Sequence, residues 1–224
     1  MSASSHAPRP YTRFILVRHG QAEGNRELRY LGATDAPLTE TGRDQALRLA
    51  PAVRPFALAA IYSSPLARAR DTARALAEDC DLPVTPRDDL REMDFGAWEG
   101  HTRAAVLAEY PDLLAAWETS AEVAPPGGES LVAVGARVVA CADALAAAHP
   151  GQTVALVSHV GPIKALVCAA LALPPAVAQR MWLDPASICV VDWRPAAGAP
   201  TSGSGILRTF NAIGHLDPPS WLAR

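Results

Sequence analysis

The chain has 224 residues, of which half are hydrophobic and 19% are charged, with a formal net charge of −3. This composition favours a folded domain with a sizeable core and excludes long disordered stretches. The slightly negative net charge also argues against non-specific binding of nucleic acid, because proteins that bind nucleic acid usually carry a basic surface stripe. The four cysteines lack metal-ligand spacing. We find no signal peptide and no apolar run long enough for a membrane span, so a cytoplasmic protein is expected.

The first third of the chain alternates between strand and helix patterns. Residues 1–10 are rich in Ser, Ala and Pro and predict a disordered leader. The apolar run at 14–17 is typical of a buried parallel strand. Apolar residues at helical spacing predict a helix over about 39–50. A second strand is expected at 60–63, and a proline can open the helix predicted at 65–80.

The middle of the chain continues this alternation. A third short strand is predicted at 83–85. Residues 102–119 indicate one or two helices around Pro111, and residues 130–148 a long helix rich in Ala and Val. A fourth strand is expected at 153–157.

The last third predicts a helix opened by a proline at 162–173, then two strands at 187–193 and 206–210. A Pro/Gly/Ser-rich stretch at 195–205 separates these strands, which indicates a hairpin with a long, mobile loop. The β–α alternation predicts a single domain over 11–224, with a mostly parallel sheet and an antiparallel edge.

Charged residues and histidines follow the predicted strands. Arg18 and His19 follow the first strand, Arg68 the second, Glu92 the third and His159 the fourth. Ligands in open α/β sheets bind beyond the carboxyl ends of the strands, so these side chains should converge. Arginines suit bidentate binding of phosphate or carboxylate. A histidine can be nucleophile, acid or base, and a carboxyl group beside an anion can be a general acid.

Each of these residues also has an ordinary alternative. An arginine after a strand is usually solvated or in a salt bridge, and a lone histidine usually bonds to backbone. Glu92 could pair with Arg91. Their joint occurrence at strand ends favours a common functional site over these separate roles.

Five separated segments resemble motifs of the histidine phosphatase superfamily, in the branch that includes cofactor-dependent phosphoglycerate mutase. They are LVRHGQAEGN at 16–25, DAPLT at 35–39 with Gly42, YSSPLARA at 62–69 continuing to Thr72-Ala73, Glu92 with FGAWEG at 95–100 and GGES at 127–130, and SH at 158–159. The match covers about 14–173. The resemblance implies a three-layer α/β/α sandwich of the phosphoglycerate mutase-like kind.

The resemblance also implies the site and its chemistry. His19 would attack phosphorus and carry the phosphoryl group, and Glu92 would protonate the leaving alkoxide and then deprotonate water. The phosphate oxygens would be held by Arg18, Arg68 and His159, with Asn25 as a supporting contact. Two arginines and a protonated histidine are expected to supply the positive charge. No cofactor and no metal are implied. The implied activity is hydrolysis of a small phosphate monoester through a phosphohistidine intermediate on His19.

The sequence departs from the family pattern at three places. Ala22 stands where the family usually has Thr or Ser. The mutases carry an Arg-rich segment for a second phosphate, whereas residues 115–120 include Glu118 and no arginine. Residues 160–164, VGPIK, replace the common Gly-Gly after the second histidine. This last stretch resembles that of phosphatase domains of the α-ribazole phosphatase-like or broad acid phosphatase kind, some of which are fused to ribonuclease H. We expect no ribonuclease H segment here.

The segment 98–126 follows Glu92 and is expected to cover the site, with Trp98 and Trp117 as substrate-lid candidates. A lid with apolar groups and the carboxylate of Glu118 predicts monoesters with an apolar or neutral body. The expected partner is thus a small phosphate ester, with no nucleic acid or membrane, and a homodimer is left open. Two alternatives stand beside the phosphatase: a phosphoglycerate mutase, and a non-catalytic phospho-ligand-binding protein.

Overall fold

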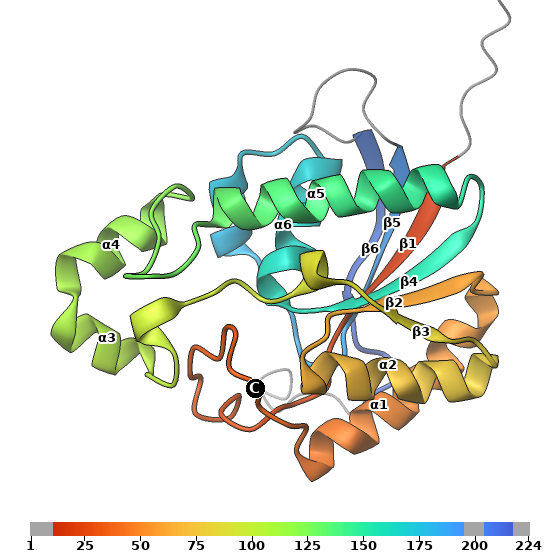
Figure 1. Ribbon diagram of the computed structural model, residues 1–224, viewed down its shortest axis with the longest axis horizontal. Coiled ribbons are helices and arrows are strands. Elements are labelled where there is room, and N and C mark those ends of the chain that lie inside the picture. The colour runs from red at the N-terminus through yellow and green to blue at the C-terminus, as the bar shows by residue number, and fades with distance from the viewer. Residues whose placement is uncertain (1–10, 195–203, 217–224) are drawn as a thin grey trace, which may run out of the picture.

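The computed structural model describes residues 11–194 and 204–216 (Figure 1). The predicted leader at 1–10 lies outside the described residues. So does most of the predicted loop at 195–205, of which residues 204 and 205 belong to the last strand.

The described residues form one six-stranded sheet in the order β3-β2-β4-β1-β5-β6. The first four strands in this order pair in parallel, whereas β5 pairs antiparallel with both β1 and β6. This arrangement confirms the predicted mostly parallel sheet with an antiparallel edge. The strands are β1 (Thr12–Arg18), β2 (Ala60–Ser63), β3 (Val84–Pro86), β4 (Thr153–Ser158), β5 (Ile188–Arg194) and β6 (Ser204–Ala212).

Helices cover both faces of the sheet, which confirms the three-layer sandwich (Figure 1). One face carries α1 (Glu40–Val53) and α2 (Ala67–Cys80), and the other carries α5 (Leu131–Ala148) and α6 (Val160–Ala170). Two short helices, α3 (Arg103–Glu109) and α4 (Pro111–Thr119), stand to one side; we call residues 95–119 the cap. Short 3₁₀ helices are η1 (Arg54–Phe56), η2 (Asp88–Leu90), η3 (Gly96–Trp98) and η4 (Pro175–Arg180).

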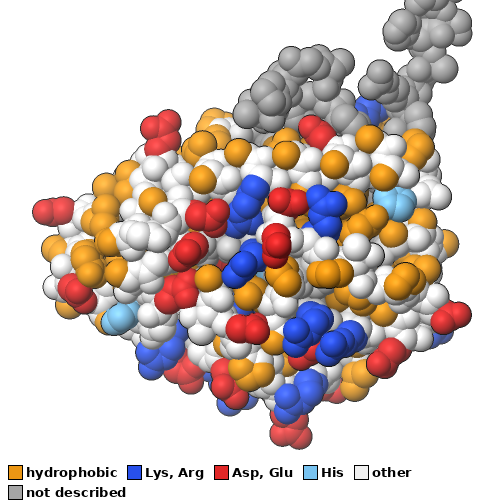
Figure 2. Space-filling view, in the orientation of Figure 1, with side chains coloured by type: hydrophobic (Ala, Val, Ile, Leu, Met, Phe, Trp, Pro, Cys, Tyr) orange, Lys and Arg blue, Asp and Glu red, His pale blue; other side chains and the backbone are white. Residues whose placement is uncertain are grey.

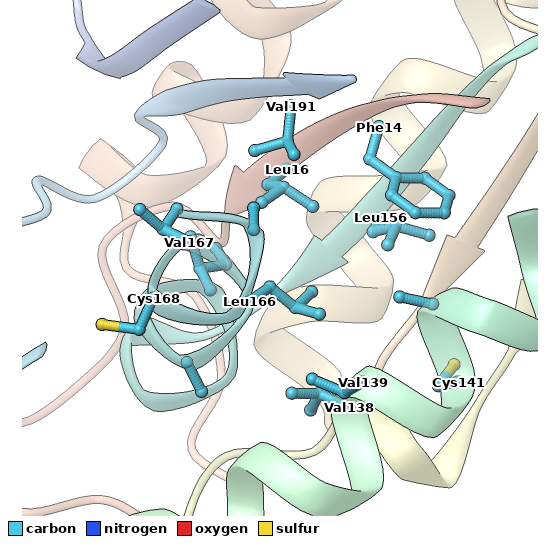
Figure 3. Close-up of a cluster of buried hydrophobic side chains, with 14 of the residues drawn as sticks. Phe14, Leu16, Val138, Val139, Cys141, Leu156, Leu166, Val167, Cys168 and Val191 are labelled. Carbon is cyan, nitrogen blue, oxygen red and sulfur yellow. The ribbon is translucent and has the colours of Figure 1, made fainter. Parts of the chain in front are cut away.

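The core consists of one hydrophobic cluster on each face of the sheet. Along β1, Phe14 and Leu16 join the cluster under α5 and α6, while Ile15 and Val17 join the cluster under α1 and α2. Figure 3 shows the first cluster, where Phe14 and Leu16 face side chains of both helices. Because helices cover both faces of the sheet, the sequence of β1 is a continuous apolar run and does not alternate between apolar and polar residues.

Helix α5 combines a length and apolar composition that could suit a membrane span with a position in the core of the described fold. Its 18 residues are long and apolar enough, by length and composition alone, to cross a membrane. Val134, Val138 and Leu145 are nevertheless buried against the sheet, as in the core helix of an α/β sandwich. Its apolar character is thus accounted for by packing inside the described fold.

Two helices begin at other residues than predicted. Helix α2 begins at Ala67, two residues after Pro65. Helix α6 begins at Val160 and contains Pro162 in its first turn, where the missing N–H removes no intrahelical bond. The earlier start of α6 aims the N–H groups of Val160 and Gly161 beyond the helix end.

Candidate active site

His19 lies directly beyond the end of β1, and only 3% of its surface is exposed. Its Nδ1 atom lies 2.7 Å from the carbonyl oxygen of Gly20, which can only accept, so Nδ1 carries the hydrogen. The lone pair of the imidazole is therefore on Nε2. Burial and the positive charges of Arg68 and Arg18 hold the pKa of His19 well below its usual value. The ring is neutral near pH 7, the state in which a histidine acts as a nucleophile.

Arg18 and Arg68 are buried beside this ring. One terminal nitrogen of Arg18 donates to the carbonyl of Leu183 at 2.5 Å. The two terminal nitrogens of Arg68 donate to the carbonyls of Thr34 at 2.6 Å and Gly32 at 2.7 Å. Burial lowers the pKa of Arg18 to about 10 and also lowers that of Arg68. Arg18 therefore stays charged at neutral pH, and each guanidinium keeps N–H groups beyond those already used.

His159 lies beyond the end of β4, and its ring centroid is 5.0 Å from that of His19. The Nε2 atom lies 2.8 Å from the hydroxyl of Ser64, which already accepts from the N–H of Leu66 at 3.3 Å. We assign the Ser64 hydroxyl as the donor to Nε2, because the hydrogen of the neutral ring then lies on Nδ1, the buried nitrogen that has no partner among the described residues. The role of Ser64 was not predicted from the sequence, although Ser64 lies within the second motif.

His159 is neutral before an anion binds, and its expected protonation with phosphate bound stays a prediction. Burial, with the positive charges near it, holds its pKa well below the usual value. A neutral His159 donates one hydrogen bond without adding a net charge. A bound phosphate dianion would oppose this shift, because a nearby negative charge favours the protonated ring.

Three buried nitrogens of these side chains have no hydrogen-bond partner among the described residues: Nε of Arg18, Nε of Arg68 and Nδ1 of His159. Buried donors are almost always paired, because an unpaired one is costly. These donors belong to three predicted phosphate ligands on one edge of the sheet. An anion held between them would satisfy all three.

Glu92 is held at the N-terminus of α6. Its Oε1 atom accepts from the N–H of Met93 at 2.9 Å and of Gly161 at 3.0 Å, and Oε2 accepts from Val160 at 3.1 Å. These three donors fix the direction of the carboxyl group. The negative charge of Glu92 acts on both Arg18 and Arg68, so it lies near the site that they form.

Arg137 on α5 fixes the segment that carries Glu92. Its guanidinium donates to the carbonyl oxygens of Asp89 and Arg91, both at 2.8 Å, and of Glu92 at 3.0 Å. It also pairs with both carboxylate oxygens of Glu129. Arg137 was not predicted from the sequence. The sequence offers one signal for it: Glu129, in the GGES segment, lies eight residues before Arg137.

The loop after β1 is shaped by local hydrogen bonds. The side-chain oxygen of Asn25 accepts from the N–H of Ala22 at 2.8 Å, so it stabilises the turn. Its phosphate contact stays a prediction. The N–H of Gly20 binds the Thr72 hydroxyl at 3.1 Å, and a Cβ on Gly20 would meet the carbonyl of Gly42 at 2.3 Å. Gly20 therefore lets the His19 loop lie directly on the start of α1.

The two lid candidates have different positions. Trp98 is fully buried in the hydrophobic centre of the cap with Val106 and Leu114, and it does not line a cavity next to Glu92. Its ring is 5.5 Å from that of Trp117, which it supports edge to face. Trp117 does line such a cavity, of about 360 Å³. The cavity wall is formed by Glu92, Met93, Phe95, Trp117, Glu118, Leu131, Val160, Gly161, Lys164, Ala178 and Gln179.

The described residues include no group of three His, Cys, Asp or Glu side chains placed to hold a metal ion. On the face seen in Figure 2, basic and acidic side chains are intermixed, and no broad stripe of one sign is visible.

The chain belongs to the histidine phosphatase superfamily (branch 1), whose family model matches residues 14–201. A bifunctional protein of Mycobacterium tuberculosis is 39% identical over 206 residues, which are 92% of this chain and 55% of that protein. The chain therefore spans about half the length of this relative. Phosphoserine phosphatase 1 of Hydrogenobacter thermophilus is 38% identical over 180 residues, 80% of this chain and 85% of the relative.

The solved structures agree with this assignment. The mycobacterial glucosyl-3-phosphoglycerate phosphatase in complex with VO3 is 35% identical, with a TM-score of 0.81, over 90% of this chain and 99% of that chain. The family membership and the sandwich fold of the sequence analysis are confirmed.

Proposed function

We propose that the chain is a phosphatase that hydrolyses a small phosphate monoester through a phosphohistidine on His19. The observation that carries the proposal is the neutral, buried His19, with its lone pair on Nε2, beside two buried arginines. A neutral imidazole can attack phosphorus without first losing a proton. The named phosphatases among its relatives support the same activity.

The proposed reaction has two steps. In the first, Nε2 of His19 bonds to phosphorus, the ester P–O bond breaks, and Glu92 gives its proton to the leaving alkoxide. In the second, Glu92 takes a proton from water, the water oxygen bonds to phosphorus, and the P–N bond breaks. Phosphate leaves, and both side chains return to their starting states.

The phosphate oxygens would be bound by Arg18, Arg68 and His159. Their unpartnered nitrogens suit this role, because preorganised donors stabilise the charge of the transition state. Each donor of this kind contributes about 10² to 10³ in kcat. The three backbone N–H groups on Glu92 suit the carboxylate that is left after proton donation, the form that then acts as a base toward water.

We also propose that the protein acts in the cytoplasm, which its free cysteines Cys80, Cys141, Cys168 and Cys189 support. The homodimer stays a prediction.

The test of the function is phosphate release from a panel of phosphorylated metabolites, with p-nitrophenyl phosphate as a general substrate. His19→Ala should release none. Glu92→Gln should lose about 10² to 10⁴ in kcat on alkyl phosphates, the usual range for acid–base catalysis. Its loss on aryl phosphates should be smaller, because their leaving groups need less protonation. Equal losses on both classes would argue against Glu92 as the acid.

A further inference from the structure

Lys164 places a positive charge in the cavity beside Glu92. It lies one turn after Val160 on α6, and both residues line the cavity with Glu92 and Trp117. Side chains on a helix lean toward its N-terminus, which is the end that holds the Glu92 carboxyl group. The Lys164 side chain therefore extends along the cavity wall toward the reacting groups.

The carboxylates of this cavity already have partners. Glu118 forms two hydrogen bonds with Arg103, at 2.6 and 2.9 Å, and Glu92 accepts from three backbone N–H groups. Lys164 forms no hydrogen bond or salt bridge with any residue that the structure describes. Burial lowers its pKa to about 8, so most Lys164 side chains are protonated at pH 7. The cavity thus presents a cation that lies within the field of the Glu92 charge but forms no direct hydrogen bond or salt bridge among the described residues.

We propose that Lys164 binds a carboxylate on the leaving group of the substrate, so that phosphate esters of hydroxy acids are preferred over neutral esters. This inference rests on the proposed phosphatase function. It replaces the expectation of a neutral body, which treated Glu118 as a free charge. The sequence alone could not reveal the ion pair of Glu118, because Arg103 lies 15 residues away on another helix.

A carboxylate suits this site better than a second phosphate. Lys164 supplies a single charge and no bidentate fork, whereas a phosphate dianion usually binds arginines or several donors. Phe95, Trp117 and Val160 form an apolar wall that suits the carbon skeleton of the leaving group. A volume of about 360 Å³ is typical of a site for a small metabolite.

The experiment compares kcat/KM for 3-phosphoglycerate and glycerol 3-phosphate, which differ in a carboxylate against a hydroxymethyl group. In Lys164→Met, the preference for 3-phosphoglycerate should fall about 10- to 100-fold, mainly through KM, as expected for a lost hydrogen bond to a charged group. Lys164→Arg should keep most of the preference. Arg74→Met, an exposed ion-paired residue on α2, is the control and should leave it unchanged.

A pH titration of the wild type tests the same inference without a variant. The KM for 3-phosphoglycerate should rise as the pH passes about 8, where Lys164 loses its proton, while the KM for glycerol 3-phosphate should not. The other charged or titratable groups facing Lys164 are Glu92, Glu118, Arg18 and Cys168. Burial raises the pKa of Cys168 above its usual value, and that of Arg18 is about 10, so neither accounts for a change near pH 8.

Three results would overturn the inference. Equal losses on both esters in Lys164→Met would assign Lys164 to the support of Glu92. A wild-type preference for 2,3-bisphosphoglycerate that Lys164→Met abolishes would make the cavity a second phosphate site. Turnover of p-nitrophenyl phosphate without any preference for 3-phosphoglycerate would reject carboxylate binding by Lys164 but would leave the proposed phosphatase function intact. Failure to hydrolyse any ester, p-nitrophenyl phosphate included, would instead reject the proposed function itself.

Discussion

The backbone N–H of Gly161 donates to Oε1 of Glu92 at 3.0 Å, and a Cβ at position 161 would lie only 2.6 Å from that same oxygen. The observed position of the Glu92 carboxyl group therefore requires glycine at residue 161. The departure from the family's Gly-Gly falls on Val160, whose side chain lines the cavity instead. The close approach at residue 161, and the open cavity at residue 160, explain why the second glycine of the family's pair is present here and the first is not.

Gly161→Ala should therefore displace the Glu92 carboxyl group without unfolding the protein. The displaced atoms are the end of a flexible side chain, and alanine favours a helix by about 1 kcal/mol over glycine. We expect kcat on alkyl phosphates to fall about 10- to 100-fold, because a misplacement of about 1 Å can cost 10²-fold. Steady-state kinetics and thermal unfolding measure the two effects.

The matched control is Gly135→Ala in α5, where an added Cβ would meet nothing within 4 Å. It should leave kcat unchanged. Wild-type kcat in Gly161→Ala would mean that the position of the Glu92 carboxyl group is not needed for turnover.

Ser64→Ala tests the assigned direction of the hydrogen bond to His159. Without the hydroxyl at 2.8 Å, Nε2 of the ring loses its donor, and the hydrogen is no longer fixed on Nδ1. We expect kcat/KM to fall about 3- to 10-fold, the effect of one hydrogen bond worth about 0.5 to 1.5 kcal/mol. Ser63→Ala is the control, because its hydroxyl is equally buried but bonds to the carbonyl of Ser64. A loss as large in Ser63→Ala would assign the effect to packing.

Much of the fold could be predicted from the sequence. The strands buried on both faces are continuous apolar runs, such as 14–17 and 153–157, so their pattern is unambiguous. The candidate site residues lie directly after the strand ends. There, parallel pairing aligns Arg18 with Ser158 and so brings His19 beside His159. These features depend on local pattern and on a general rule of open sheets.

The remaining parts of the site depend on contacts between distant segments. Arg137 reaches the carbonyl of Glu92 across 45 residues, and no local pattern reveals that contact. Trp98 and Trp117 have similar sequence surroundings, yet one fills the centre of the cap and the other lines the cavity. The complete burial of His159, which lowers its pKa, could not be judged from the sequence.

The lowered pKa of His159 predicts how stability depends on pH. Its folded-state pKa lies below the unfolded value of about 6.5, so between these values the unfolded chain binds more protons. The free energy of unfolding should therefore fall as the pH falls from about 7 to 5, by up to about 1.4 kcal/mol per pH unit for this group. Urea unfolding at several pH values measures the slope.

His159→Gln should reduce that slope, because the variant lacks the titrating ring. His101→Gln, at an exposed position in the cap, is the control and should retain the wild-type slope. An unchanged slope in His159→Gln would show that burial does not disfavour the protonated ring.

The most direct test of the proposed mechanism is the trapping of the phosphoenzyme. The protein is mixed with a phosphate ester that it hydrolyses, and the reaction is quenched within milliseconds. The quenched protein should carry a phosphoryl group that is labile in acid and stable in base, as expected for phosphohistidine. Peptide mapping under alkaline conditions should locate it on His19, and His19→Ala should carry none while remaining folded. Glu92→Gln, studied with an aryl phosphate, should accumulate more of it, because activation of water is impaired. Turnover by the wild type without any phosphoenzyme, or an undiminished phosphoryl group in His19→Ala, would contradict the account.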